Sequence, residues 1–113
     1  MPGIPEISTY ENDIAVFIHV SGEISLYHTE ALKKKMQRII AKNDERLLFC
    51  FNFAAVSYID SSGIGLITVI AKELHRDEKR LVMCCVNDDI RSLFELVQLT
   101  KIVPMFGSEA DVC

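Results

Sequence analysis

The sequence lacks any apolar run that approaches the roughly 20 residues of a membrane-spanning helix. It also lacks a leader in which a charged and then an apolar segment precede a small-residue cleavage site. Basic charge is not in excess, because 16 acidic residues outweigh 12 lysines and arginines, and the pI is near 5.3. We therefore expect a soluble, unexported, cytoplasmic protein that binds neither a membrane nor nucleic acid, which would require a basic face.

Signatures of common enzyme classes are missing as well. Ser61 does not lie in a Gly-x-Ser-x-Gly elbow, and no histidine is placed by the sequence as its base. Gly63 and Gly65 lack the third glycine of a dinucleotide-binding loop, and no Gly-Lys-Ser/Thr follows them. A phospho-aspartate receiver needs an acidic pair after an early strand, whereas residues 20–23 offer one acid. We expect no catalytic activity and no cofactor.

The cysteines and histidines do not predict a metal or redox site. Cys84 and Cys85 are adjacent, so they lack the Cys-x-x-Cys redox spacing. Together with Cys50 they lie in apolar, strand-like runs, which favours buried reduced thiols over a disulfide framework, and Cys113 is the remaining cysteine. His19 has no metal-ligating companions at useful spacing and is expected to be structural.

What is present is a regular alternation of apolar patterns over a length that suits one domain, residues 1–113. The expected strands are Ile7–Tyr10, Ile14–Val20, Leu47–Phe53, Leu81–Val86 and Ile102–Val103. The expected helices begin near His28 or Thr29, at Asp60 and after Asn87, with a last helical turn at Ser108–Asp111. The strand expected at Ile14–Val20 has an aliphatic face that consists of Ile14, Val16, Ile18 and Val20. The third helix has a core stripe that consists of Ile90, Leu93, Phe94 and Val97. This order predicts an α/β fold with a mixed, mainly parallel sheet of four to five strands and helices packed mostly on one face.

The junction at Asp60 is the most informative segment. Asp60 is placed to cap the second helix, with Ile59 and Ile64 at the positions of a hydrophobic staple. Ser61 and Ser62 then occupy the first turn, where free N–H groups and the helix dipole tolerate a phosphate. Two glycines follow, each of which costs about 1 kcal/mol relative to alanine in a helix interior, so close approach of a strand or of a partner is expected there. Taken alone, the four residues Asp-Ser-Ser-Gly are better explained as a capped helix start with no further role.

Several segments in order resemble the STAS domain, and specifically the bacterial anti-sigma factor antagonists. The motif Asp60-Ser61-Ser62-Gly63-Ile64-Gly65, preceded by residues 56–59, resembles the family signature. Residues 21–24 resemble the family's Gly-Glu-Leu/Val-Asp turn, residues 91–96 its third helix, and residues 99–103 the segment that follows. The resemblance extends over most of the chain, roughly residues 14–110, and implies the same fold.

The resemblance also implies a mechanism in which this chain is a phosphoprotein in a partner-switching cycle. Unmodified, it would bind an anti-sigma factor that is an ATP-binding serine kinase and so free a sigma factor for transcription. The kinase would phosphorylate the serine directly after the motif aspartate, here Ser61, and a PP2C-type phosphatase would remove the group. The expected partner-binding residues are Gly22, Glu23, Ser25, Tyr58, Asp60, Ser61, Ser62, Gly63, Ile64 and Gly65.

Three positions depart from the family pattern. Ser25 and Asn52 stand where aspartate is usual, which makes the expected site less acidic, and Gln98 replaces a glycine at a position suited to left-handed backbone. These departures leave an alternative open, in which the domain is a scaffold or a sensor of a small apolar or nucleotide ligand and is not phosphorylated. The intact Asp60-Ser61-Ser62-Gly63 favours the switch, because a scaffold has no need of the hydroxyl pair.

Overall fold

The structure is a computed structural model that describes residues 4–112. The elements in chain order are β1 (Glu6–Glu11), β2 (Val16–Ile24), α1 (Thr29–Lys42), β3 (Leu48–Ile59), α2 (Ser61–Arg76), β4 (Arg80–Cys84), α3 (Asp88–Leu96), the 3₁₀ helix η1 (Leu99–Lys101), β5 (Met105–Phe106) and α4 (Glu109–Val112). Within the described residues, none of the helices has the length and apolar character that a bilayer crossing requires.

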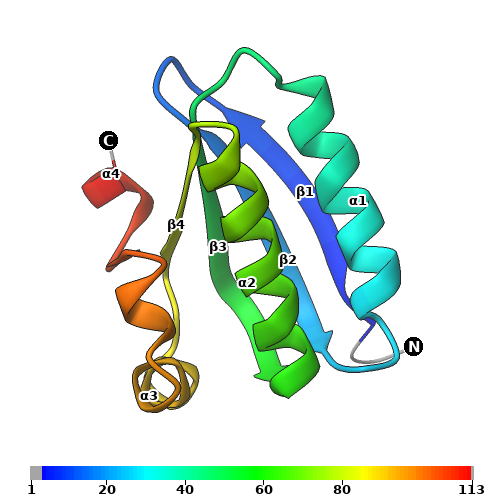
Figure 1. Cartoon of the computed structure of the whole chain (residues 1–113). Helices are drawn as coiled ribbons and strands as arrows, with labels where there is room; N and C mark the ends of the chain where they lie inside the picture. Colours follow the sequence, from blue (N-terminus) through cyan, green and yellow to red (C-terminus); the bar gives the residue numbers. More distant parts are fainter. Residues whose placement is uncertain (1–3, 113) are drawn as a thin grey trace.

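The strands form one sheet in the order β1-β2-β3-β4-β5. β1 pairs antiparallel with β2, and the other neighbours pair in parallel. Helices α1 and α2 lie side by side across one face of this sheet, as strand-helix-strand crossovers require (Figure 1). The predicted α/β class, mixed sheet and arrangement of helices are confirmed.

Two apolar clusters hold the layers together. The larger one joins the helix-covered face of the sheet to α1, α2 and α3, and includes Phe49, Phe51, Phe53 and Phe94. A smaller cluster lies on the other face of the sheet and contains Phe17, Cys50 and Cys84. Val112 of α4 packs against it. The middle of β3 is therefore covered on both faces, which explains its continuous apolar sequence.

Cys50 and Cys84 are buried, as expected for reduced thiols, whereas Cys85 follows the end of β4 and is only half-buried. The sulfur atoms of Cys50 and Cys84 lie 3.6 Å apart. Burial, reinforced by Cys50, raises the pKa of the Cys84 thiol well above its ordinary range. This thiol stays protonated at physiological pH and is a poor nucleophile.

The second strand differs from its prediction at both ends. Ile14 lies before β2 and is 52% exposed, so it is not part of the buried aliphatic face. Residues 21–24, expected as a turn, continue the strand to Ile24. Gly22 has a φ of 91°, and the pairing register between β2 and β3 shifts directly after it, which marks a β-bulge. The strand continues through this bulge, where a turn was expected.

The C-terminal third corrects two further predictions. Residues 102–103 were expected as the last strand, but they form an irregular segment after η1, in which Ile102 is 53% exposed. The last strand is instead Met105–Phe106, which follows Pro104. Val97 does not join the core stripe of α3, since it caps the helix and is 47% exposed. The left-handed backbone of Gln98 (φ 64°) redirects the chain into η1.

Besides the packing of Val112, a carboxylate of the short α4 bonds the sheet. Oε2 of Glu109 accepts a hydrogen bond from Asn52 Nδ2 at 2.7 Å and lies 2.6 Å from His19 Nε2. His19 is thus a structural residue, as expected, and the predicted final helical turn is present as α4.

Candidate functional site

The expected site residues come from the carboxyl ends of β2 and β3. These strands are parallel neighbours in which Glu23 is paired with Tyr58 and Ile24 with Ile59. Both therefore end at the same edge of the sheet, where α2 begins. This register brings Gly22, Glu23 and the following Ser25 beside the Asp60 motif, although some 35 residues separate the two segments in sequence.

Asp60 connects the two strand ends. Its Oδ1 accepts hydrogen bonds from Ser62 Oγ (2.5 Å) and Gly63 N (3.1 Å), which caps α2 as predicted. Its Oδ2 accepts a hydrogen bond from Leu26 N at 3.0 Å, and its own N–H donates to Ile24 O at 3.2 Å. One carboxylate thus fixes the start of α2 and the β2–α1 loop relative to each other.

These bonds favour the ionised form of the carboxyl. The hydrogen bond from the hydroxyl of Ser62 is the largest cause that lowers the pKa of Asp60 below its ordinary value of 3.8. Burial acts in the opposite direction, and the backbone N–H groups of Gly63 and Leu26 lower the pKa further. Asp60 therefore carries its negative charge throughout the physiological pH range, beside any group added to Ser61.

Removing the Asp60 side chain is expected to destabilise the fold. Asp60→Ala should lower the free energy of unfolding by about 1–2 kcal/mol, the usual loss for an N-cap, as measured by urea unfolding at pH 7. Asp60→Asn, which can still cap, should lose less. Because the pKa of Asp60 is lowered in the folded state, the stabilisation from its charge is present above its unfolded pKa near 4 and is lost as pH falls through the folded value.

The pH dependence separates the charge from the cap. The stability difference between the wild type and Asp60→Asn should be constant from pH 7 to about pH 5 and shrink below pH 4. A wild-type midpoint equal to that of Asp60→Ala at every pH would show that Asp60 does not stabilise this junction.

The two serines of the first turn differ in their environment. Ser62 is half-buried and its hydroxyl donates to Asp60, next to a hollow of about 170 Å³ that Thr29 and Lys33 also line. Ser61 is exposed, and its hydroxyl has no hydrogen-bond partner among residues 4–112. Only Ser61 presents its oxygen to an approaching protein without first breaking a bond.

The two glycines of the motif also differ. A Cβ on Gly63 would lie 2.5 Å from Ile59 Cγ1 and 3.0 Å from the carbonyl oxygen of Ile24, so this glycine lets the helix approach the strand ends. A Cβ on Gly65 would meet no atom within 4 Å. Ile64, between them, is half-buried against the same core cluster as Ile59, as expected for a staple.

Three exposed apolar side chains adjoin the motif, and two of them were not predicted from the sequence. Tyr27 is 91% exposed and Leu26 is 70% exposed in the β2–α1 loop, and Tyr58 at the end of β3 is 50% exposed. Leu26 and Tyr27 directly follow Ser25, in the loop between a strand and an amphipathic helix. An apolar pair in such a loop is the sequence signal that could have identified them as part of the site. We call these three residues, together with Ser61 and Gly65, the α2-start surface.

One residue discussed from the sequence does not join this surface. The side chain of Asn52 bonds Glu109 under α4, so its replacement of a usual aspartate does not alter the charge around Ser61. Ser25 does lie at the site, half-buried, and its carbonyl accepts from His28 N at 2.9 Å. Across residues 4–112, no three histidine, cysteine or acidic side chains come together as metal ligands would.

Comparison with known proteins adds a family match to this geometry. A family model described as STAS domain matches residues 6–112. The anti-sigma-B factor antagonist of Staphylococcus aureus is 30% identical over 97 residues, which cover 86% of this chain and 88% of the relative.

Solved structures show the same fold at lower identity. The crystal structure of an anti-sigma factor antagonist from Mycobacterium paratuberculosis matches with a TM-score of 0.85 and 20% identity, covering 98% of this chain and 92% of that chain. The anti-sigma factor antagonist SpoIIAA in its unphosphorylated form matches with a TM-score of 0.76 at 21% identity, covering 95% of this chain and 93% of that chain. Its phosphorylated form, from Bacillus, matches with a TM-score of 0.69 at 21% identity over 95% of this chain and 96% of that chain.

Proposed function

Because the chain belongs to the STAS domain family, we propose that it is an anti-sigma factor antagonist, switched off by phosphorylation of Ser61. In the unmodified state it binds an anti-sigma factor that is a serine kinase and thereby frees the sigma factor. A PP2C-type phosphatase restores the unmodified state. The observation that carries this proposal is the contrast in the first turn of α2, where Ser61 is exposed and unbonded while Ser62 is held by Asp60.

The geometry supports a switch that needs no refolding. A phosphate on Ser61 would lie at the positive end of the α2 dipole, which the fold tolerates. It would add about −1.5 to −2 charges beside the ionised Asp60. Burying that charge in an interface without a partner costs several kcal/mol, so phosphorylation disrupts binding rather than folding.

The α2-start surface supplies the apolar contact that such an interface needs. Leu26 and Tyr27 project from a loop that Asp60 fixes relative to the start of α2. Tyrosine is among the residues that most often carry the binding energy of interfaces, inside a polar rim, and Leu26 adds apolar surface beside Tyr27. Gly65 lies one turn after Ser61 on the same face of α2, and the open space beside it lets a partner approach the helix there.

Two readouts on the protein purified from its native cells test the proposal. Intact mass and phosphosite mapping, with and without phosphatase treatment, should find one phosphate, located on Ser61. Phosphate found only on Ser62 would overturn the assignment of the switch. Persistent absence of phosphate across growth and stress conditions would instead favour the scaffold or ligand-sensing alternative.

The second readout is capture of an ATP-binding serine kinase by the immobilised, unphosphorylated chain. Leu26→Ala should reduce capture at least tenfold, because it removes an anchor that is 70% exposed and not part of the core. Leu47→Ala is the matched control, since Leu47 is 65% exposed and directly precedes β3, at the opposite end of that strand from Tyr58 and the motif. Equal loss in both variants would place the binding surface elsewhere.

A further inference from the structure

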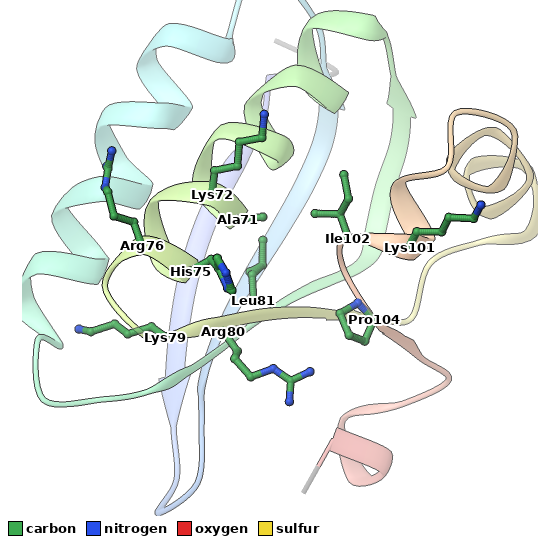
Figure 2. Close-up of a pocket in the computed structure, with 10 residues that line it drawn as sticks. All are labelled: Ala71, Lys72, His75, Arg76, Lys79, Arg80, Leu81, Lys101, Ile102 and Pro104. Carbon is green, nitrogen blue, oxygen red and sulfur yellow. The ribbon is translucent and has the colours of Figure 1, made fainter.

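A hollow of about 530 Å³ lies at the carboxyl end of α2. Its lining comes from α2, from β4 and from the segment around η1 (Figure 2): Ala71, Lys72, His75, Arg76, Lys79, Arg80, Leu81, Lys101, Ile102 and Pro104. The sixteen residues of α2 span about 24 Å at 1.5 Å per residue, so this hollow is remote from Ser61 at the other end of the helix.

The lining is cationic in a chain whose net charge is −4. It includes no carboxylate. Lys72, Arg76, Arg80 and Lys101 are all exposed, and none of the four forms an ion pair with any acidic side chain among residues 4–112. The charge of Lys79 is already used, because its ammonium bonds the carbonyl of Asp44 and lies 3.6 Å from that residue's carboxylate.

Helix stabilisation does not account for this arrangement. A cation in the last turn of α2, such as Arg76, is stabilised by the helix dipole. Lys72 and Arg76, however, are spaced i, i+4 on α2, where like charges destabilise a helix. Arg80 begins β4 and Lys101 ends η1, so the dipole of α2 is not the reason for their presence.

Between these cations lies an apolar floor. Figure 2 shows Ala71, Leu81, Ile102 and Pro104 at the centre of the hollow, with Lys72, Arg80 and Lys101 around them. Leu81 is only 5% exposed, whereas Ile102, which directly follows η1 in place of the expected strand, is 53% exposed. An apolar floor with a few convergent charged groups, in a volume between about 300 and 1,000 Å³, is typical of small-molecule sites.

We propose that this hollow binds a small organic molecule that carries at least two negative charges in phosphoryl groups beside an apolar body. Guanidinium groups bind phosphate oxygens in pairs, and lysine adds compact positive charge. The apolar body would pack on Leu81 and Ile102. A concave site of this size fits a small molecule better than an extended acidic protein segment.

Titration followed by amide chemical-shift mapping tests the proposal on the unmodified chain, without a partner protein, so its outcome is independent of the proposed switch. The probes are adenosine diphosphate, geranyl diphosphate and inorganic pyrophosphate. At least one organic diphosphate should bind ten times more tightly than pyrophosphate and shift the amides of residues 71–81 and 101–104. The two organic probes differ only in the body, so they distinguish an aromatic from an aliphatic ligand.

Paired variants separate this site from general attraction of anions. Arg80→Gln with Lys101→Gln should weaken binding of the organic probe at least tenfold. Lys34→Gln with Arg38→Gln, which removes one exposed lysine and one exposed arginine from α1, should leave it unchanged. Equal loss in both pairs, or affinity no greater than that of pyrophosphate, would overturn the proposal. If an acidic peptide such as oligoglutamate binds more tightly than both organic diphosphates, the proposal is also overturned, and the hollow is instead a protein-docking surface.

Discussion

Ser61→Asp is expected to weaken binding of the captured anti-sigma kinase by about 100-fold and to leave the thermal midpoint unchanged. The substitution places one permanent charge next to the ionised Asp60, in a surface that the partner must cover. An uncompensated charge in an interface costs several kcal/mol, and 1.4 kcal/mol corresponds to a factor of ten in affinity. Phosphorylation itself adds up to two charges, so the modified protein should lose roughly two to four orders of magnitude.

Stability should not follow affinity in this variant, because an acid in the first turn of a helix is favourable. Calorimetric titration and thermal unfolding of the same samples measure both quantities. Ser61→Ala should bind like the wild type and resist phosphorylation by the kinase. Ser92→Asp, which adds the same charge at an exposed position of α3, is the matched control and should bind normally. Unchanged affinity of Ser61→Asp, or an equal loss in Ser92→Asp, would remove Ser61 from the interface.

The elements around the motif could be predicted from the sequence because each has a strong local cause. Asp60 caps α2 through its own side chain, and Asn87 caps α3 by the same bond to the third residue, here Ile90 N at 2.9 Å. The apolar middle of β3 reflects burial on both faces. Local cause and final structure agree at these places, as is typical of sequences that fold reliably.

The remainder depends on contacts between distant segments. The bulge after Gly22 is set by pairing with β3, and the short β5 exists only because Met105 and Phe106 pair with Met83 and Cys84. The basic hollow likewise combines the end of α2 with a turn 25 residues further along the chain. At the candidate site, the motif itself could be predicted from the sequence. The place of Leu26 beside the motif could not, because it follows from the hydrogen bond between Leu26 N and the Asp60 carboxylate, which only the structure shows.

Gly63→Ala is expected to destabilise the protein by about 1–3 kcal/mol, the usual cost of overpacking a filled core, even though alanine is the better helix former. The added Cβ would lie 2.5 Å from Ile59 Cγ1, 2.9 Å from Ile24 Cγ2 and 3.0 Å from the Ile24 carbonyl oxygen. A side chain can move away, but that carbonyl belongs to the strand end that Asp60 bonds. α2 must therefore shift away from the sheet, which disturbs the cap and the loop of Leu26 together.

Gly65→Ala is the matched substitution two residues later, and it should have the opposite effect. With no atom within 4 Å of the new Cβ, only the gain in helix propensity remains, up to about 1 kcal/mol. Urea unfolding of both variants measures the contrast. The larger Gly65→Val should affect partner binding more than stability, because its side chain would occupy space that the fold leaves open. If Gly63→Ala proves as stable as the wild type, the helix start is not held against the strand ends; if Gly65→Val binds the kinase normally, the partner does not approach at this position.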